Sequence, residues 1–223
     1  MAFPTTGILD NFNRADENPL STAGNIGAPI FTVAGGGPQS FKLVSNAIQD
    51  DSLADGGGSA QMYWDGATFG PGIEVYVKLV TPWQNNSSDF WFWVAGNAEN
   101  TTGLDGYQAY VYYSAGTWFY TIWRIDNNVG TELTPSAEAG PTFADGDQIG
   151  IELSGGTFTY KYKTAAGSWG NASGVSTRSD STYTSGHIGI SKGFNDTTTS
   201  LDDFGGGTIV KGVRQLATVG VGK

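Results

Sequence analysis

The sequence predicts an all-β protein folded as one sandwich or barrel. Glycine fills 34 of the 223 positions, whereas Leu, Met, Lys and Glu, which favour helices, are scarce. No stretch repeats its apolar residues with a helical period, while short alternating runs separated by turn residues recur along the chain. In addition, residues 9–12 (LDNF) return near the end as residues 201–204 (LDDF). We expect these two segments to pair as the first and last strands and to close one sheet.

The turn residues divide the chain into about a dozen short strands, a number typical of a sandwich or barrel. Glycine clusters at 35–37 and 56–58 separate the first short runs, and 73–80 then alternates cleanly, with Val75, Val77 and Leu79 on one face. Residues 89–125 hold the most aromatic runs, and Gly155 and Gly156 predict a tight hairpin between 148–153 and 157–163. The predicted strands are 28–33, 40–44, 60–64, 73–80, 89–95, 107–113, 117–125, 148–153, 157–163, 187–191 and 201–204.

Charge and cysteine content exclude several classes of function. The net charge of −10 argues against a nucleic-acid partner, because affinity for phosphates requires concentrated Lys and Arg. Without cysteine, the chain can form neither a disulfide nor a thiolate zinc site. The first residues lack the basic and apolar segments of a signal peptide, and no stretch approaches a membrane span in length. We expect no signal peptide and no membrane partner.

The last thirteen residues, 211–223, differ from the rest because they carry three cations, no acid and a series of apolar residues. We expect residues 1–210 to form the folded domain and 211–223 to form an extended arm. The arm is either a frayed terminus or a segment that orders against a neighbouring subunit. Lys211, Arg214 and Leu216 are its candidate assembly residues.

Three consecutive strands are apolar on both faces, which is unusual for a two-layer sandwich. We assign one face of these strands to the core and expect the other to point outward. The core set is Phe90, Phe92, Ala109, Val111, Tyr120 and Ile122. The outer set is Trp91, Trp93, Tyr110, Tyr112 and Trp123, with Gln108 as a polar neighbour.

Exposed rings in such numbers need an explanation, and three remain open. Indole and phenol rings pack against the C–H groups of sugars and hydrogen-bond their hydroxyls, so the outer set is a candidate glycan site. Tyr and Trp are also enriched in protein interfaces, which makes a partner subunit the second explanation. The third is that the long loops 83–88 and 168–184 fold over the rings and bury them.

Pairing of the two matched segments would gather Asp10, Asp202 and Asp203 at one sheet edge. Carboxylate oxygens are the ligands that calcium prefers, so these three residues are a candidate structural calcium site. Alternatively, the side chains face water or tie down the loop that begins at Arg14. The sequence contains no calcium motif of fixed spacing.

The sequence offers little for catalysis. A hydroxyl/imidazole/carboxylate triad would depend on His187, the one histidine, and no nucleophile-elbow motif accompanies it. Glycoside hydrolysis uses two carboxylates that flank one bond. Around Glu74, however, Tyr76 and Lys78 occupy the alternate positions, and Glu152 is also isolated in sequence. We predict no catalytic residues.

Several segments resemble jelly-roll domains of tailed-phage virion proteins, especially minor tail and related surface proteins. These segments are 8–16 (ILDNFNRAD), 69–77 (FGPGIEVYV), 106–107 (GY), 123–127 (WRIDN), 144–152 (ADGDQIGIE) and 201–207 (LDDFGGG). The fold that the resemblance implies is similar to the concanavalin A-like lectin/glucanase sandwich. It also implies a structural or adhesive virion component, displayed on the head or the tail, that contacts glycans. Because the strand around Glu74 departs from the acidic pattern of the glucanases, enzymatic activity is not implied.

We therefore expect an antiparallel jelly-roll sandwich of two curved sheets. Its expected role is that of a non-enzymatic virion protein, a head decoration or minor tail component. Such a protein is made in the host cytoplasm and has other virion proteins and further copies of itself as partners. The alternative is a stand-alone carbohydrate-binding module. A glycan hydrolase, the third class, would lose turnover when Glu74 or Glu152 is replaced by glutamine.

Overall fold

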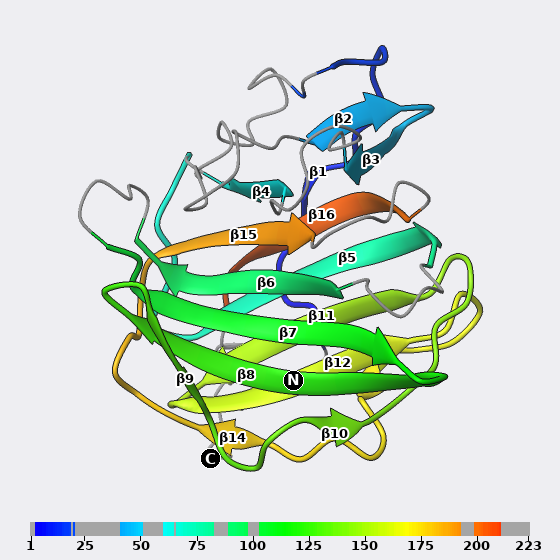
Figure 1. The fold of residues 1–223 in the computed structure, drawn as a ribbon. Coiled ribbons are helices and arrows are strands. Elements are labelled where there is room, and N and C mark those ends of the chain that lie inside the picture. Colours follow the sequence, from blue (N-terminus) through cyan, green and yellow to red (C-terminus); the bar gives the residue numbers. More distant parts are fainter. Residues whose placement is uncertain are drawn as a thin grey trace, which may run out of the picture.

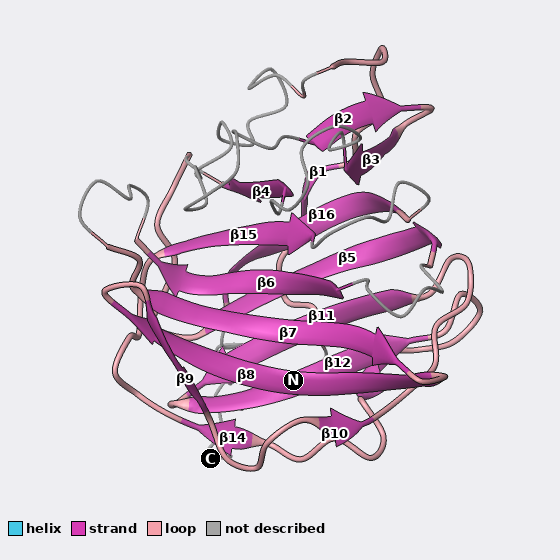
Figure 2. Cartoon of the chain, in the orientation of Figure 1, coloured by secondary structure: helices cyan, strands magenta, loops and turns pink. Residues whose placement is uncertain are grey.

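The computed structural model describes residues 3–18, 20, 41–50, 60–64, 66–82, 89–97, 103–192 and 199–210. Within these ranges the chain forms sixteen strands and no helix (Figure 2). The strands make two antiparallel sheets that pack face to face, which confirms the predicted jelly-roll sandwich (Figure 1). In the same ranges there is no helix long and apolar enough to span a membrane.

Sheet I lies behind in Figure 1 and contains the strands nearest both ends of the chain. Its order is β13 (Gly170–Asn171), β12 (Thr157–Lys163), β11 (Gln148–Ser154), β5 (Ile73–Thr81), β16 (Ser200–Thr208), β3 (Ala47–Asp50) and β2 (Phe41–Val44). In addition, β1 (Ile8–Asp10) pairs with β16, and β14 (Arg178–Ser179) pairs with β12.

Sheet II lies in front and carries the aromatic strands. Its order is β10 (Glu138–Ala139), β8 (Thr117–Asp126), β7 (Gly106–Ser114), β6 (Asp89–Gly96), β15 (His187–Lys192) and β4 (Ala60–Tyr63). The short strand β9 (Val129–Glu132) pairs with the second half of β8, next to the site where β10 pairs with its first half.

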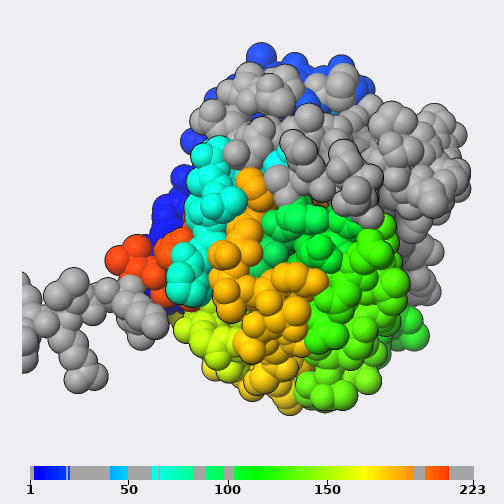
Figure 3. Space-filling view, turned by 90° about the vertical axis from the view of Figure 1, so that its left-hand side faces the viewer, coloured from blue at the N-terminus to red at the C-terminus, as the bar shows by residue number. Residues whose placement is uncertain are grey.

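The two matched segments pair as the sequence predicts. Ile8 lies opposite Gly205 and Asp10 opposite Phe204 in an antiparallel register. In the space-filling view, the early residues (blue) lie against the last described ones (red) (Figure 3). The predicted strand 28–33 and the predicted arm 211–223 fall outside the described residues.

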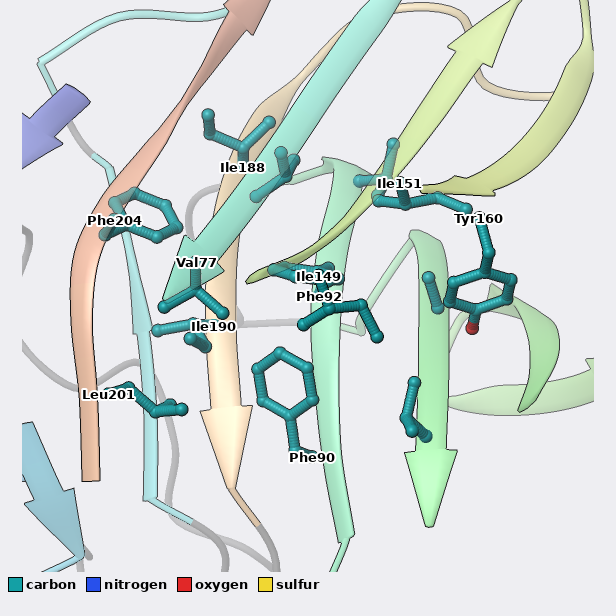
Figure 4. Packing of buried hydrophobic residues seen from close by; sticks show 14 of the residues in the cluster. Val77, Phe90, Phe92, Ile149, Ile151, Tyr160, Ile188, Ile190, Leu201 and Phe204 are labelled. Carbon is teal, nitrogen blue, oxygen red and sulfur yellow. The ribbon is translucent and has the colours of Figure 1, made fainter. Parts of the chain in front are cut away.

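The core is filled by the inward face of each sheet. Phe90, Phe92, Ala109, Val111, Tyr120 and Ile122 are all fully buried, as predicted. Figure 4 shows side chains from the two sheets meeting, with Val77 and Ile149 from sheet I opposite Phe92 and Ile190 from sheet II. Tyr160 of β12 spans this core and donates its hydroxyl to the Thr121 carbonyl oxygen of sheet II at 2.7 Å. The same hydroxyl lies 3.0 Å from the Tyr110 carbonyl oxygen, so it joins the two layers by polar contacts within the core.

The N-terminal segment crosses the outer face of sheet I and covers an acidic side chain. Glu74 is only 1% exposed, although it points away from the core. Its Oε1 accepts the backbone N–H groups of Thr5 and Thr6, at 2.6 and 2.5 Å, and the Thr6 hydroxyl at 2.6 Å. Gly150 leaves room for this segment, since a Cβ there would lie 2.6 Å from the ring of Phe3. The buried carboxylate therefore anchors the start of the chain to the sheet.

Candidate functional site

The outer face of sheet II gathers the predicted aromatic set. Trp93 lies opposite Gln108, which lies opposite Trp123, so these three side chains form one row across β6, β7 and β8. Trp91 and Tyr110 are opposite each other in the next row. The sequence therefore placed all of these side chains on the correct face of the correct strands.

The two tryptophans of β6 are buried, however, and the prediction that they are exposed is wrong. Trp91 is 6% exposed and Trp93 is 3% exposed. With Ile125 they form a second apolar cluster, separate from the core, against which Tyr110 and Trp123 pack. The rings of this face are numerous enough to bury one another in part.

Neither of the two loops expected to cover this face can be assigned that role. The loop 83–88 falls outside the described residues. The loop 168–184 lies instead along sheet I, where its strands β13 and β14 pair with β12. Above the buried tryptophans, Gln108, Tyr110, Tyr112 and Trp123 remain half-buried and partly open to solvent.

A continuous series of rings crosses this face. Trp91 stacks on Tyr110, with ring centroids 5.2 Å apart and planes at 29°. Tyr110 contacts Tyr112 at 5.8 Å, and Tyr112 stacks on Phe119 at 5.3 Å with planes at 20°. We call Trp91, Tyr110, Tyr112 and Phe119 the aromatic ladder. Phe119 is not in the predicted outer set, although it lies two residues before Thr121 and therefore on the same face of β8.

The ladder ends at two polar atoms that have no partner among the described residues. Asp89 precedes Trp91 by two positions and so shares its face, and Tyr110 donates its hydroxyl to Asp89 Oδ2. The other carboxylate oxygen, Oδ1, is buried without a hydrogen bond, and so is Trp91 Nε1. Burial raises the pKa of Asp89 to about 7. An unpaired acceptor and an unpaired donor therefore belong to two residues on the same face of β6, an arrangement that the sequence did not reveal.

The predicted calcium ligands do not form a metal site, because Asp10 pairs with an arginine and both Asp202 and Asp203 pair with one lysine. The Asp10 carboxylate accepts the N–H of Phe12 at 2.7 Å and contacts Arg14 Nη1 at 2.9 Å through both oxygens. Lys78 Nζ lies 3.0 Å from Asp202 Oδ2 and 3.6 Å from Asp203 Oδ2. In the described ranges, no group of three or more Asp, Glu or His side chains is arranged to hold a metal ion. The first acid thus ties down the Arg14 loop, and the last two pair with a lysine.

The candidate acids of a hydrolase also have structural partners. Glu74 and Glu152 lie directly opposite each other on β5 and β11, although each is isolated in sequence. Glu74 is covered by the N-terminal segment, and Glu152 Oε2 lies 3.0 Å from Lys161 Nζ. His187 is placed by its Nδ1, which lies 2.9 Å from the Trp64 carbonyl oxygen.

The candidate assembly residues Lys211, Arg214 and Leu216 lie outside the described residues. The structure therefore gives no account of the arm, and its role stays a prediction.

Comparison with known proteins identifies the fold. No protein-family model and no curated protein matches the chain. Among solved structures, the carbohydrate-binding module CBM66 from Bacillus subtilis is 13% identical and covers 76% of this chain and 90% of its own, with a TM-score of 0.52. The VIP36 exoplasmic/lumenal domain, in a form bound to Ca²⁺ and Man3GlcNAc, is 12% identical, with coverages of 79% and 84% and a TM-score of 0.52.

A phage protein is also similar along nearly its whole length. The CBM2 module of the evolved Dit of Lactobacillus casei BL23 phage J-1 is 14% identical, with coverages of 91% and 95% and a TM-score of 0.52. At such identities the likeness shows the fold alone. The chain has the jelly-roll sandwich of lectins and carbohydrate-binding modules.

Proposed function

We propose that this protein binds glycans, without cleaving them, on the outer face of sheet II. The observation that carries the proposal is the aromatic ladder with the unpaired Asp89 Oδ1 and Trp91 Nε1 at one end. Ring faces pack against the apolar faces of sugars, while a sugar hydroxyl both donates and accepts. A sugar hydroxyl would therefore satisfy Asp89 Oδ1 as a donor or Trp91 Nε1 as an acceptor.

Access to the unpaired atoms depends on Tyr110. Its ring stacks on Trp91 and its hydroxyl donates to Asp89, so this side chain lies over both. An unsatisfied buried polar group costs about 1–3 kcal/mol. If Tyr110 rotates as a ligand enters, hydrogen bonds from the ligand to the unpaired atoms would recover part of that free energy. The half-buried Gln108 and Trp123 would line the other end of the site.

We further propose that the protein is a component of a bacteriophage virion, as a head decoration or minor tail protein. The resemblance of its sequence segments to phage virion domains supports this role, as does the fold shared with the phage J-1 Dit module over 91% of the chain. In this proposal the arm 211–223, with Lys211, Arg214 and Leu216, attaches the domain to other virion proteins or to further copies of itself. The alternative is a stand-alone carbohydrate-binding module, which the similarity to CBM66 favours.

Binding to immobilised glycans, followed by calorimetry with the best oligosaccharide, tests the glycan proposal. Truncation of a contacting ring removes apolar contact area, so Tyr112→Ala and Trp123→Ala should each weaken binding at least tenfold, or about 1.4 kcal/mol. Ile8→Ala is the matched control, because Ile8 is an exposed apolar residue on β1 of sheet I. The proposal fails if the ring variants bind as tightly as the control.

Deletion of residues 211–223 separates the virion protein from the stand-alone module. A virion protein that attaches by its arm loses incorporation into particles but keeps its glycan affinity. Incorporation at the wild-type level would refute the role of the arm, and absence of the full-length chain from purified particles would favour the module.

A further inference from the structure

An open cleft of about 520 Å³ lies on the other side of the molecule from the ladder. It is formed where the N-terminal segment meets β12 and the loop that leads into β13. Its lining combines two rings with two ammonium groups and polar side chains. Among the lining residues are Phe3, Lys161, Lys163, Ser168, Trp169 and Asn171.

Contacts between rings fix the apolar wall of the cleft. Phe3 packs edge-on against Trp169, with centroids 4.8 Å apart, and Tyr76 closes the group at 6.1 Å from Phe3 and 6.0 Å from Trp169. The loop that carries Trp169 is held by a turn in which the N–H of Gly167 donates to the Thr164 carbonyl oxygen at 2.9 Å. The indole is therefore positioned in the cleft before any ligand binds, and it remains partly exposed.

The two lysines of the cleft differ in whether an acidic side chain neutralises their charge. Lys161 Nζ contacts Glu152 Oε2 at 3.0 Å and donates to Asn171 Oδ1 at 2.9 Å, so its charge is neutralised within the protein. Lys163 makes no ion pair with any residue of the described part of the chain. The cleft therefore offers one uncompensated positive charge on a chain whose net charge is −10.

We propose that this cleft binds a saccharide unit that carries one negative charge. The sugar ring packs on Trp169, the anionic group lies at Lys163, and Asn171 and Ser168 supply hydrogen bonds to hydroxyls. A single charge is favoured because the acidic protein repels polyanions, and a phosphomonoester would bring a charge of about −1.5 to −2. Uronic acids and phosphodiester-linked sugars both have the required charge. This site is independent of the ladder on sheet II.

Calorimetry on the full chain with three probes tests the proposal. The probes are methyl galacturonide, the methyl ester of the same sugar, and a methyl glycosyl phosphodiester, so each anionic probe carries one negative charge. We expect saturable binding of at least one anionic probe and at least tenfold weaker binding of the neutral ester. Which anionic probe binds distinguishes uronic acid from phosphodiester recognition. Failure of both anionic probes, or equal affinity for the ester, would overturn the proposal.

Variants assign the binding to the cleft. Lys163→Gln should lower the affinity for the anionic probe at least tenfold. Lys42→Gln on β2, which removes a positive charge elsewhere, should leave this affinity unchanged. Trp169→Ala should abolish binding. If Trp169→Ala does not fold, the indole N–H resonance of Trp169 in the wild-type spectrum must shift with the probe instead. Trp123→Ala should bind the anionic probe normally, so this proposal and the ladder proposal fail separately. Equal effects of the two lysine variants would contradict the cleft assignment.

Discussion

Replacement of Arg178 by methionine should strongly destabilise the fold. The Arg178 side chain is 0% exposed and joins β14 to the segment that connects β9 and β10. It donates to four carbonyl oxygens, those of Pro135 at 3.2 Å, Ser176 at 2.7 Å, Tyr120 at 3.0 Å and Ser136 at 3.1 Å. It also lies 3.2 Å from Glu138 Oε2.

The expected loss in the free energy of unfolding depends on which of these partners are left unpaired. Among the four bonds, the one to Tyr120 is buried, and a buried unsatisfied carbonyl costs about 1–3 kcal/mol. Loss of the cation from Glu138 adds to this, although that carboxylate keeps the N–H and hydroxyl of Ser176 as donors. Since breaking a buried ion pair costs about 3–5 kcal/mol, we expect a loss of that size, a large part of a typical stability of about 5–15 kcal/mol.

Urea unfolding monitored by tryptophan fluorescence measures the effect. Arg178→Met should lower the free energy of unfolding by about 3–5 kcal/mol and the melting temperature by roughly 6–20 °C. Lys42→Met on β2 removes a positive charge from a partly exposed position and should have a much smaller effect. A loss below about 0.5 kcal/mol for Arg178→Met, the range of ordinary surface substitutions, would refute the reasoning.

Four further outcomes are expected. Glycan affinity should rise with pH up to the Asp89 pKa of about 7, by at most tenfold per pH unit, because a ligand hydroxyl that donates to Oδ1 favours the ionised form; Asp89→Asn should abolish this dependence. Because the pKa of Asp89 is raised on folding, its contribution to the free energy of unfolding is largest below its unfolded pKa of about 3.9. This contribution is lost as pH rises through about 7. Denaturant titrations of the wild type and of Asp89→Asn at several pH values measure it. Gly150→Ala should cost about 1–3 kcal/mol in urea unfolding, because its Cβ would lie 2.7 Å from the Val75 carbonyl oxygen and 2.6 Å from the ring of Phe3. Gly170→Ala, where a Cβ meets nothing within 4 Å, should not destabilise the fold. Chelation by EDTA should leave the melting temperature unchanged, since Asp10 and Asp202 already have cationic partners; a fall that calcium reverses would contradict this.

The fold was predictable because turn residues separate its strands and because some long strands, such as β5, alternate between apolar and polar residues. In β5, the series Val75, Val77 and Leu79 faces the core, and the matched ends pair as expected. Strands such as β10, β13 and β14 were missed because two residues are too short to show a period. Similarly, Glu74 and Glu152 face each other only because of the register between two strands that are far apart in sequence.

The candidate site was predictable only in part. Alternation places Trp91 and Tyr110 on one face, but it does not tell how many neighbouring rings cover each other, so the burial of Trp91 was not foreseen. The unpaired oxygen of Asp89 depends on which atoms the neighbouring rings shield, which no sequence pattern encodes. Asp10 was assigned to a metal by its residue type, whereas its partner Arg14 lies only four positions away.

The most direct test of the central claim is a titration of the protein with its best neutral oligosaccharide, followed by the ¹H–¹⁵N resonances of indole and side-chain amide groups. The glycan site proposed on sheet II predicts that the resonances of Trp91, Trp123 and Gln108 shift and saturate together, while that of Trp118, in the core behind the same sheet, stays unchanged. Saturable binding that leaves these three resonances in place would contradict the account.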